Sequence, residues 1–418
     1  MKFRLSLSVP HPFRDINNLI FSIMKYSNKV SKFLIYHILI EHQNYLLLLY
    51  LGEPRTGIQK VPTPWKCPRC GSRHGFVRRG WRSKPRTLKT SIGIIEFPLR
   101  NISCKKCGKT FSPFPEFWGL EPWQRISKEL SEKAIFLATQ FSYARSSNTL
   151  KELLNNSLAP ITIHRMVQKT SGNIDCKNND IIDPNVLMFD DTKVPAGDKE
   201  YGADLLLGIA IESNYRKHNR NHLKKSIISF NIDQGWRDVK LELKNKFKPD
   251  TVITDGDIKV KKFIEDVFPN SKIQQCIWHL FKTSDHYLWM DGLTVPVRRP
   301  LLKELSKLVE NQDLNGIKVF VEQLQINGLE NTANFINRGL KDLFTYLEED
   351  IPFKATSPIE REMREINRRS DVGARWTVVG LSNLLNLRLA YEKNRKTWNN
   401  YWYDYSYEKR DNLSIVKI

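Results

Sequence analysis

The sequence predicts an α/β protein whose largest domain has a mixed β-sheet with helices on both faces. Five segments are predicted strands, of which the first four are rich in apolar residues: 186–190, 205–211, 226–232, 251–254 and 271–275. Helical patterns at 236–247 and 259–268 separate the third, fourth and fifth of them. Three strands, a helix, a strand, a helix and a strand is the chain order of the RNase H-like α/β fold. We therefore expect this fold over residues 183–395.

The first 60 residues are expected to form a helical N-terminal segment. Its most apolar stretch, 33–51, includes Glu41 among other polar side chains. An acidic side chain at the centre of a bilayer costs about 2.5–3.5 kcal/mol on insertion scales, so we expect a buried or partner-facing helix and no membrane span. Residues 1–14 lack the apolar core and the cleavage site of a secretory signal, and we expect a cytoplasmic protein.

Four cysteines with metal-binding spacing predict a zinc ribbon over residues 61–115. Cys67 and Cys70 form one Cys-x2-Cys pair, Cys104 and Cys107 form another, and a glycine follows each pair. Two such pairs supply the four thiolates of a tetrahedral structural Zn²⁺ site. The 33 residues between the pairs exceed the commonest spacing of about 15–20, and a hairpin or a three-stranded sheet fills that interval. Reduced cysteines without metal are the alternative.

Basic residues are concentrated in the same region. The chain carries 66 Lys and Arg against 45 Asp and Glu, and the formal net charge of +21 favours polyanionic partners. Residues 61–120 contain 13 basic and two acidic side chains, with aromatic side chains between the cations. A solvated basic face is the alternative to a nucleic-acid surface. The candidate DNA-binding residues here are Arg78, Arg79, Trp81 and Arg82.

A helical DNA-binding unit is expected over residues 116–175. One helix begins after Ser127, a second covers 147–154, and a third covers 160–169 with cationic side chains beside an apolar stripe. This order suits a helix-turn-helix, in which the last helix enters the major groove. A three-helix packing unit without DNA contact is the alternative. The candidate DNA-binding residues of the third helix are His164, Arg165 and Lys169.

Two of the predicted strands run directly into aspartate, at Asp190 and at Asp255. In an RNase H-like sheet the first strand is central and the fourth lies beside it, so we expect the two carboxylates to meet. Carboxylates that close repel each other unless cations lie between them, and oxygen ligands suit Mg²⁺ or Mn²⁺. Two such ions can activate a water or a 3′-hydroxyl for an in-line displacement at phosphorus. Asp191 and Asp257 are the alternatives, and a single strand-end aspartate is often only a turn former.

A third acid is expected on a helix that follows an all-helical insertion at about 285–352. A proline in the first turn marks the start of this helix, and Glu360 and Arg364 share one of its faces. Glu360 could bind a metal ion while Arg364 donates to phosphate. Glu362 and Glu365 are the alternatives, although we expect neighbouring arginines to pair with them.

Together these motifs resemble the Mutator-like DDE transposases of bacterial and archaeal insertion sequences, over about residues 60–395. The matching segments are Asp190-Asp191-Thr192-Lys193-Val194, Asp255-Gly256, Cys276-x2-His279, Ser357-Pro358-Ile359-Glu360-Arg361 and Ile366-Asn367-Arg368-Arg369. The family commonly has glycine after the first acid, where this chain has Asp191, so both Asp190 and Asp191 stay candidates.

The resemblance implies a transposase that binds the terminal inverted repeats of its element through the ribbon and the helices. Asp190, Asp255 and Glu360, with Mg²⁺ or Mn²⁺, would then cut these ends and join them to target DNA, by a cut-and-paste or a copy-out route. We expect a homodimer or higher oligomer on double-stranded DNA, associated with the nucleoid. The resemblance also places Cys276 and His279 near the active site, where packing in the core is their alternative role.

Two other functions remain possible interpretations of the sequence. A zinc-ribbon transcription regulator would use the basic first half of the chain and not the acids. An RNase H-like nuclease would use the acids without joining strands. Residues 396–418 are expected to be a C-terminal tail, whose role the sequence does not indicate.

Overall fold

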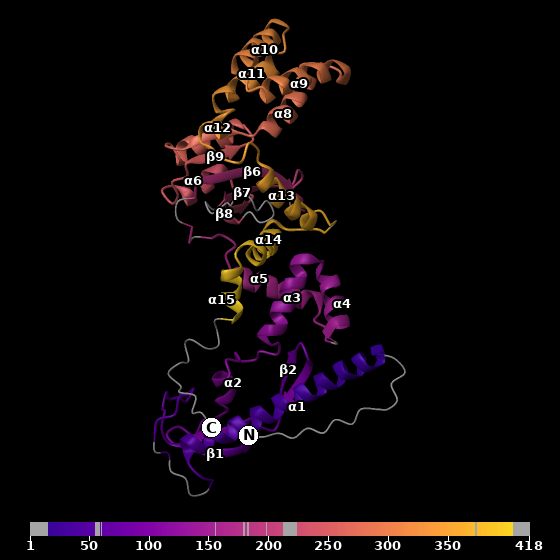
Figure 1. The fold of residues 1–418 in the computed structure, drawn as a ribbon. Coiled ribbons are helices and arrows are strands. Elements are labelled where there is room, and N and C mark those ends of the chain that lie inside the picture. Colours follow the sequence, from indigo (N-terminus) through magenta and orange to yellow (C-terminus); the bar gives the residue numbers. More distant parts are fainter. Residues whose placement is uncertain are drawn as a thin grey trace. The chain divides into compact units, whose positions relative to one another are not determined.

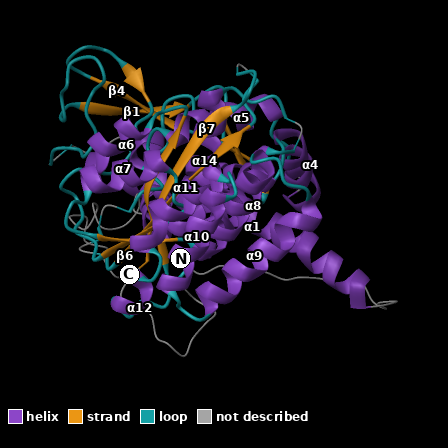
Figure 2. Cartoon of the chain, turned by 90° about the horizontal axis from the view of Figure 1, so that it is seen from above, coloured by secondary structure: helices purple, strands orange, loops and turns teal. Residues whose placement is uncertain are grey.

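The computed structural model describes residues 16–54, 59, 61–154, 156–178, 180–181, 184–197, 199–211, 224–372 and 374–403. The chain divides into two compact units, drawn in Figure 1. The first comprises Met1–Leu137 and Tyr143–Ile163, and the second comprises Ala138–Ser142 and His164–Ile418. Helices and strands both contribute to the chain, which is a mixed α/β protein (Figure 2).

The strands of the first unit surround the two cysteine pairs. An antiparallel sheet has the order β1-β4-β5 and contains Phe76–Trp81 (β1), Arg100–Cys104 (β4) and Thr110–Phe111 (β5). A separate hairpin joins Arg86–Thr90 (β2) to Gly93–Phe97 (β3). The short helix α2, Phe114–Phe117, follows the sheet. The strands β1 to β4 therefore occupy the long interval between the two cysteine pairs, and β5 follows the second pair.

One long helix, α1 (Ile16–Leu51), covers these strands. Gln43 is fully buried, and its side chain donates to the Pro98 carbonyl at 3.1 Å and accepts from the Arg100 amide at 2.8 Å. A polar residue that argues against a bilayer thus ties the helix to the connection between β3 and β4. Among the described residues, no helix has the length and apolar character needed to cross a membrane. Three buried leucines of α1 belong to the same apolar cluster as residues of β1, β3 and β4: Leu46, Leu47 and Leu51.

Three helices follow at the positions where the sequence predicts them. They are α3 (Lys128–Gln140), α4 (Tyr143–Leu154) and α5 (Pro160–Ser171). The second begins at Tyr143 and is one turn longer than the predicted segment 147–154. Each has an apolar side that is fully buried, for example at Ala134, Leu150 and Ile163.

All five predicted strands of the large domain are present in one mixed sheet of the second unit. They are Val186–Val194 (β6), Ala203–Ile211 (β7), Lys225–Ile232 (β8), Thr251–Thr254 (β9) and Lys272–Gln275 (β10). The spatial order is β10-β9-β6-β7-β8. The first three strands are antiparallel neighbours, whereas β9 and β10 lie parallel to β6. The first strand is central and the fourth lies beside it, as expected.

The first strand is longer than the sequence predicts. Asp190 and Asp191 do not end β6, because the pairing with β7 continues through both residues to Val194. In contrast, β9 pairs with β6 only as far as Met188. Asp190 therefore lies on the central strand just past the point where its parallel neighbour stops.

Helices cover this sheet. The helices α6 (Trp236–Leu243) and α7 (Ile258–Val267) pack over a buried cluster that includes Leu187 and Phe189. The helix α13 (Ser357–Ser370) contacts β6 and β7, and α14 (Val378–Lys393) contacts β8. Side chains alternate between the two faces of a strand, so Asp190 faces away from the cluster around Leu187 and Phe189.

The predicted helical insertion has its own apolar core. Its main helices gather together, in orange in Figure 1, and start with α8 at Ile277, earlier than the predicted boundary near 285. The elements are α8 (Ile277–Met290), α9 (Val295–Glu310), α10 (Leu314–Ile326), α11 (Glu330–Gly339), the 3₁₀ turn η1 (Leu340–Asp342) and α12 (Thr345–Glu348).

The expectation of a tail from residue 396 is wrong for its first part. Residues Arg395–Tyr403 form helix α15, in which Trp398 is fully buried and Trp402 is 8% exposed. The Trp398 ring packs edge-on against Tyr391 of α14, with ring centroids 5.2 Å apart. The rest of the predicted tail, 404–418, lies outside the described residues.

Candidate active site and metal centre

Asp190 lies in a concentration of negative charge. Burial, followed by the charges of Asp255, Asp191 and Glu360, raises the pKa of its carboxyl to about 7, against a lowering hydrogen bond from the Asp191 amide. That amide donates to Asp190 Oδ1 at 2.9 Å. Asp255 follows the last residue of β9 directly. Three acids that lie far apart in the sequence are thus electrostatic neighbours at one edge of the sheet.

The neighbouring Asp191 has different surroundings. Its pKa is raised by burial and by the charges of Asp255 and Asp257, while a hydrogen bond with Trp236 lowers it. Trp236 is the first residue of α6 and packs against the cluster on the α6–α7 face. Asp257 is the N-cap of α7, where its carboxylate accepts from the Lys259 amide at 2.6 Å.

Glu360 lies in the first turn of α13 and is held by a buried threonine. Thr356 Oγ1 donates to Glu360 Oε1 at 3.1 Å and lies 3.2 Å from His279 Nδ1. The amide and the hydroxyl of Thr356 each lie 3.3 Å from the sulfur of Cys276. The predicted pair Cys276 and His279 therefore meets Glu360 through Thr356, whose role the sequence analysis missed.

The titration of His279 reflects two opposing influences. Burial lowers its pKa and is the largest effect, while the charges of Asp255 and Glu360 raise it. Its Nδ1 lies 3.8 Å from Glu360 Oε1. The pKa of Cys276 is raised, chiefly because the thiol is buried. A protonated thiol that accepts a hydrogen bond from the Thr356 amide packs and orients its neighbours.

The two alternatives to Glu360 are both engaged in ion pairs. Glu362 is 3% exposed and lies 2.8 Å from both Lys225 Nζ and Lys393 Nζ. Burial raises its pKa, but the hydrogen bonds and charges of these two lysines outweigh burial, and the net shift is downward. Glu365 pairs with Arg368, as expected, and with Arg388. The expectation of arginine partners is wrong for Glu362, because its partners come from β8 and α14.

Arg364, the candidate phosphate ligand, is exposed on α13. No ion pair of this side chain occurs within the described part of the chain. Asn367 on the same helix differs from Arg364 in exposure, because its side-chain oxygen Oδ1 is buried and has no hydrogen-bond partner among the described residues. Arg364 is therefore available to an anionic ligand.

The four cysteines of the ribbon form a candidate metal centre. Their sulfur atoms all lie within 4.8 Å of one another, with Cys67 and Cys107 at 3.5 Å and Cys70 and Cys104 at 3.6 Å. A tetrahedral zinc with Zn–S bonds of about 2.3 Å needs sulfur separations of about 3.8 Å. The residues present therefore fit a Zn²⁺ ion.

Glycines complete both turns of this centre. The amides of Gly71 and Gly108 donate to the carbonyls of Cys67 and Cys104 at 2.9 and 2.8 Å. Both glycines have φ near +70°, at 68° and 71°, a conformation that other residues rarely adopt. Within the described residues, these cysteines are the one group of potential ligands gathered so tightly. The oxygen atoms of Asp190, Asp255 and Glu360 are farther apart.

The candidate DNA-binding residues differ in their exposure and in their contacts within the protein. The Arg78 guanidinium donates to the carbonyls of Leu47 and Gly52, and so joins α1 to β1. Arg79 and Arg82 are exposed, and Trp81 is 40% exposed with the Arg100 guanidinium 3.8 Å from its ring centroid. In α5, His164 is half-buried, whereas Arg165 and Lys169 are exposed.

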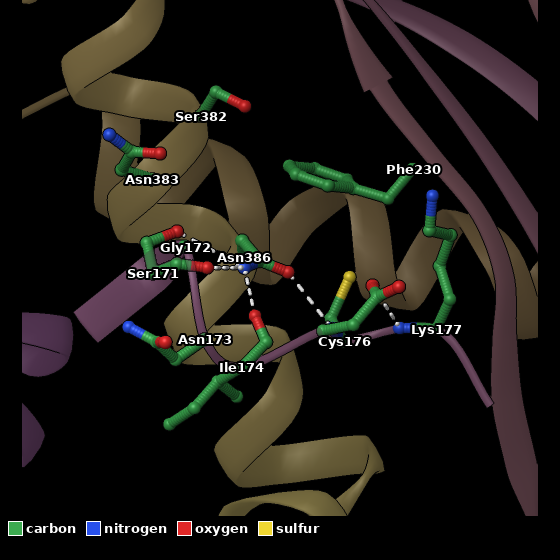
Figure 3. A pocket seen from close by; sticks show the side chains of 11 residues that line it. Ser171, Gly172, Asn173, Ile174, Cys176, Lys177, Phe230, Ser382, Asn383 and Asn386 are labelled. Carbon is green, nitrogen blue, oxygen red and sulfur yellow. Dashed lines mark hydrogen bonds between the residues drawn. The ribbon is translucent and has the colours of Figure 1, made fainter. Parts of the chain in front are cut away.

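A pocket of about 470 Å³ lies between α14 and the segment that follows α5 (Figure 3). Asn386 fixes this segment: its amide nitrogen donates to the Ile174 carbonyl at 2.6 Å, and its oxygen accepts from the Cys176 amide at 2.9 Å. Phe230 forms another wall. None of the three candidate acids is among the described residues that line this pocket.

The chain matches a known protein family. A model of the family described as "Transposase, Mutator family" matches residues 69–377. The matched segment includes the three candidate acids, Cys276 and His279, and all of the mixed sheet. A comparison with curated proteins found no match.

Proposed function

The chain belongs to the Mutator family of transposases, and we propose that it binds the ends of its insertion sequence and cuts and joins DNA strands there. Asp190, Asp255 and Glu360 would act together as ligands of Mg²⁺ or Mn²⁺. The carboxylate oxygens of all three are the ligands that such ions prefer.

The charge around Asp190 is the observation that carries this proposal. A carboxyl whose pKa reaches about 7 through burial and through Asp255 and Glu360 is costly in the folded chain. Groups whose pKa is perturbed in this way cluster at functional sites. A bound cation would stabilise the ionised carboxylates and so offset their repulsion. Divalent ions bound there would activate the attacking water or 3′-hydroxyl and stabilise the leaving oxygen.

Residues around Glu360 support its role. Thr356 donates to the carboxylate, and Glu362 of the same helix pairs with Lys225 of β8 and with Lys393 of α14. We propose that Thr356 and His279 orient Glu360, with Cys276 as a packing partner. The exposed Arg364 would donate to a phosphate of the bound strand.

The strand order supports an RNase H-like catalytic domain over residues 183–395, with the helical insertion between β10 and α13. The cysteine centre supports a zinc ribbon over residues 61–115 that holds structural Zn²⁺. We also propose that α3 to α5 form a helix-turn-helix within residues 116–175. Exposed side chains on these two parts would contact the terminal inverted repeats: Arg79, Trp81, Arg82, Arg165 and Lys169.

Isosteric replacement of the acids tests the mechanism. Asp255→Asn and Glu360→Gln should each abolish Mg²⁺-dependent cleavage of DNA that carries the element's ends, while binding to those ends persists. Asp266→Asn is the matched control, because Asp266 is exposed on α7 and pairs only with Lys240 among the described residues. Cleavage by both active-site variants would rule out the three-acid mechanism.

A second substrate separates joining from cutting. Wild-type protein given precut ends and a target plasmid should insert them with Mg²⁺ present. Cleavage without any insertion would favour a nuclease. Binding without cleavage by the wild-type protein would favour a transcription regulator.

A further inference from the structure

A second pocket, of about 230 Å³, lies beside Asp255. Thr254 and Gly256, the two chain neighbours of Asp255, line it. One wall is a face of α7, the floor is the edge strand β10, and α11 with η1 form the other wall. The pocket therefore opens next to the proposed site of phosphoryl transfer.

Gln275 supplies a polar group in the floor of this pocket. The residue is 3% exposed, and its Nε2 is buried without a hydrogen-bond partner among the residues that the structure describes. An amide in that state is costly, and such groups are rare in folded proteins. Neither the fold nor the proposed metal site uses this donor.

Two glycines make room for the Gln275 amide. A Cβ atom at Gly256 would lie 2.9 Å from Nε2, and a Cβ at Gly339 would overlap the side-chain oxygen. Gly256 also has φ of 93°, which other residues rarely adopt. The amide is thus placed between two positions that must both lack a side chain.

The other lining residues define the kind of ligand. Ile258, Ile273 and Phe335 are apolar walls, and the exposed Lys262 and Arg338 lie at the rim. Lys261 is already engaged, because its Nζ lies 2.5 Å from Asp342 Oδ2 and 3.1 Å from the Arg338 carbonyl.

This combination fits a nucleotide better than a bare phosphate. An apolar wall with an aromatic ring suits the face of a base, and a carboxamide can pair with the edge of a base. The rim cations suit the phosphate that the base carries. A base inside a duplex cannot enter so small a recess, so the ligand must leave its stack.

We propose that this pocket takes one unpaired nucleotide of the DNA strand next to the cleavage point, with Gln275 pairing with the edge of its base. The inference rests on the proposed function, because it requires the strand to pass Asp255. Lys262 and Arg338 hold the phosphate of that nucleotide.

The first test measures binding alone. DNA ends carrying 2-aminopurine at successive positions are mixed with the wild-type protein in EDTA, so that cleavage does not contribute. Fluorescence should rise at one position near the cleavage point, because the base leaves its stack. Gln275→Leu, which keeps the approximate size of the side chain, should suppress that rise while overall affinity stays within about threefold.

The second test couples the base to the amide. Removing the base at the same position should slow cleavage by the wild-type protein about tenfold, the usual scale for one well-made base contact. Gln275→Leu should slow cleavage of intact DNA to a similar extent and lose nothing further on the abasic substrate. Equal abasic effects in both proteins would overturn the proposal.

Gly339→Ala provides an independent variant, because the new methyl group pushes the amide into the pocket. Gly172→Ala is its control, since the nearest atom to an added Cβ there is 3.9 Å away. If Asp255→Asn abolishes cleavage but no position responds to Gln275→Leu, only the pocket inference fails. If Asp255→Asn and Glu360→Gln both still cut, the three-acid mechanism of the proposed function fails, and the fluorescence test still decides the pocket.

Discussion

Removal of one lysine under helix α13 should destabilise the protein by a predictable amount. Lys225 is 10% exposed, and its Nζ lies 2.8 Å from the carboxylate of Glu362 and 3.1 Å from the Pro358 carbonyl. Lys393 holds the same carboxylate at 2.8 Å. Lys225→Met keeps most of the apolar stem and removes only the charge and its hydrogen bonds.

The magnitude follows from the partners that remain. Stranding a buried charge completely costs about 3–5 kcal/mol. Because Lys393 still pairs with Glu362, Lys225→Met should lose only a charge-assisted hydrogen bond and one weaker bond, about 2–3 kcal/mol in unfolding free energy. The double variant with Lys393→Met leaves the carboxylate unpaired and should reach about 3–5 kcal/mol.

Urea unfolding of the full chain measures these values. Lys240→Met is the matched control, because Lys240 pairs with Asp266 where both side chains are exposed, and it should cost about 0–1 kcal/mol. If Lys225→Met lowers the unfolding free energy no more than Lys240→Met does, the ion pairs of Glu362 do not hold α13 in place. A double variant no less stable than Lys225→Met alone would contradict the sharing of Glu362 by two lysines.

Three further outcomes are expected. Thr356→Val should lower the cleavage rate about 10- to 100-fold with little change in end binding, and Thr356→Ser should restore it, because a hydroxyl orients Glu360; equal rates for Val and Ser would contradict this. Purified protein should contain one zinc per chain by elemental analysis, and Cys104→Ser should lose both the zinc and DNA binding. DNA binding that survives the loss of zinc would contradict a structural role of the metal. Replacing Arg79 and Arg82 by alanine should lower the salt dependence of DNA binding by about two counterions, whereas Arg78→Ala should lower thermal stability and leave that slope unchanged.

Features that short segments encode could be predicted from the sequence. The two Cys-x2-Cys pairs carry the ligand types, the spacing and the glycines of their turns within five residues each, and the structure brings all four sulfurs together. Four of the five strands could also be predicted in this way, because their apolar runs are buried on both faces of the sheet.

Features that depend on distant partners could not be predicted. The strand β6 continues past Asp191 only because β7 lies opposite, and the polar run of Thr192 and Lys193 has no strand pattern of its own. Trp398 lies in a polar, aromatic segment that resembles a tail until it packs on α14. Glu362 finds a partner 137 residues away in Lys225, whereas the sequence suggested its neighbouring arginines.

The choice among neighbouring acids depends on the same kind of information. Successive residues of a strand point to opposite faces, so Asp190 and Asp191 cannot serve one site equally. Asp191 has Trp236 of α6 as a hydrogen-bond partner, on the face that carries the apolar cluster. Glu360 shifts the pKa of Asp190, and it belongs to α13. A metal ion shared with Glu360 would therefore favour Asp190 over Asp191.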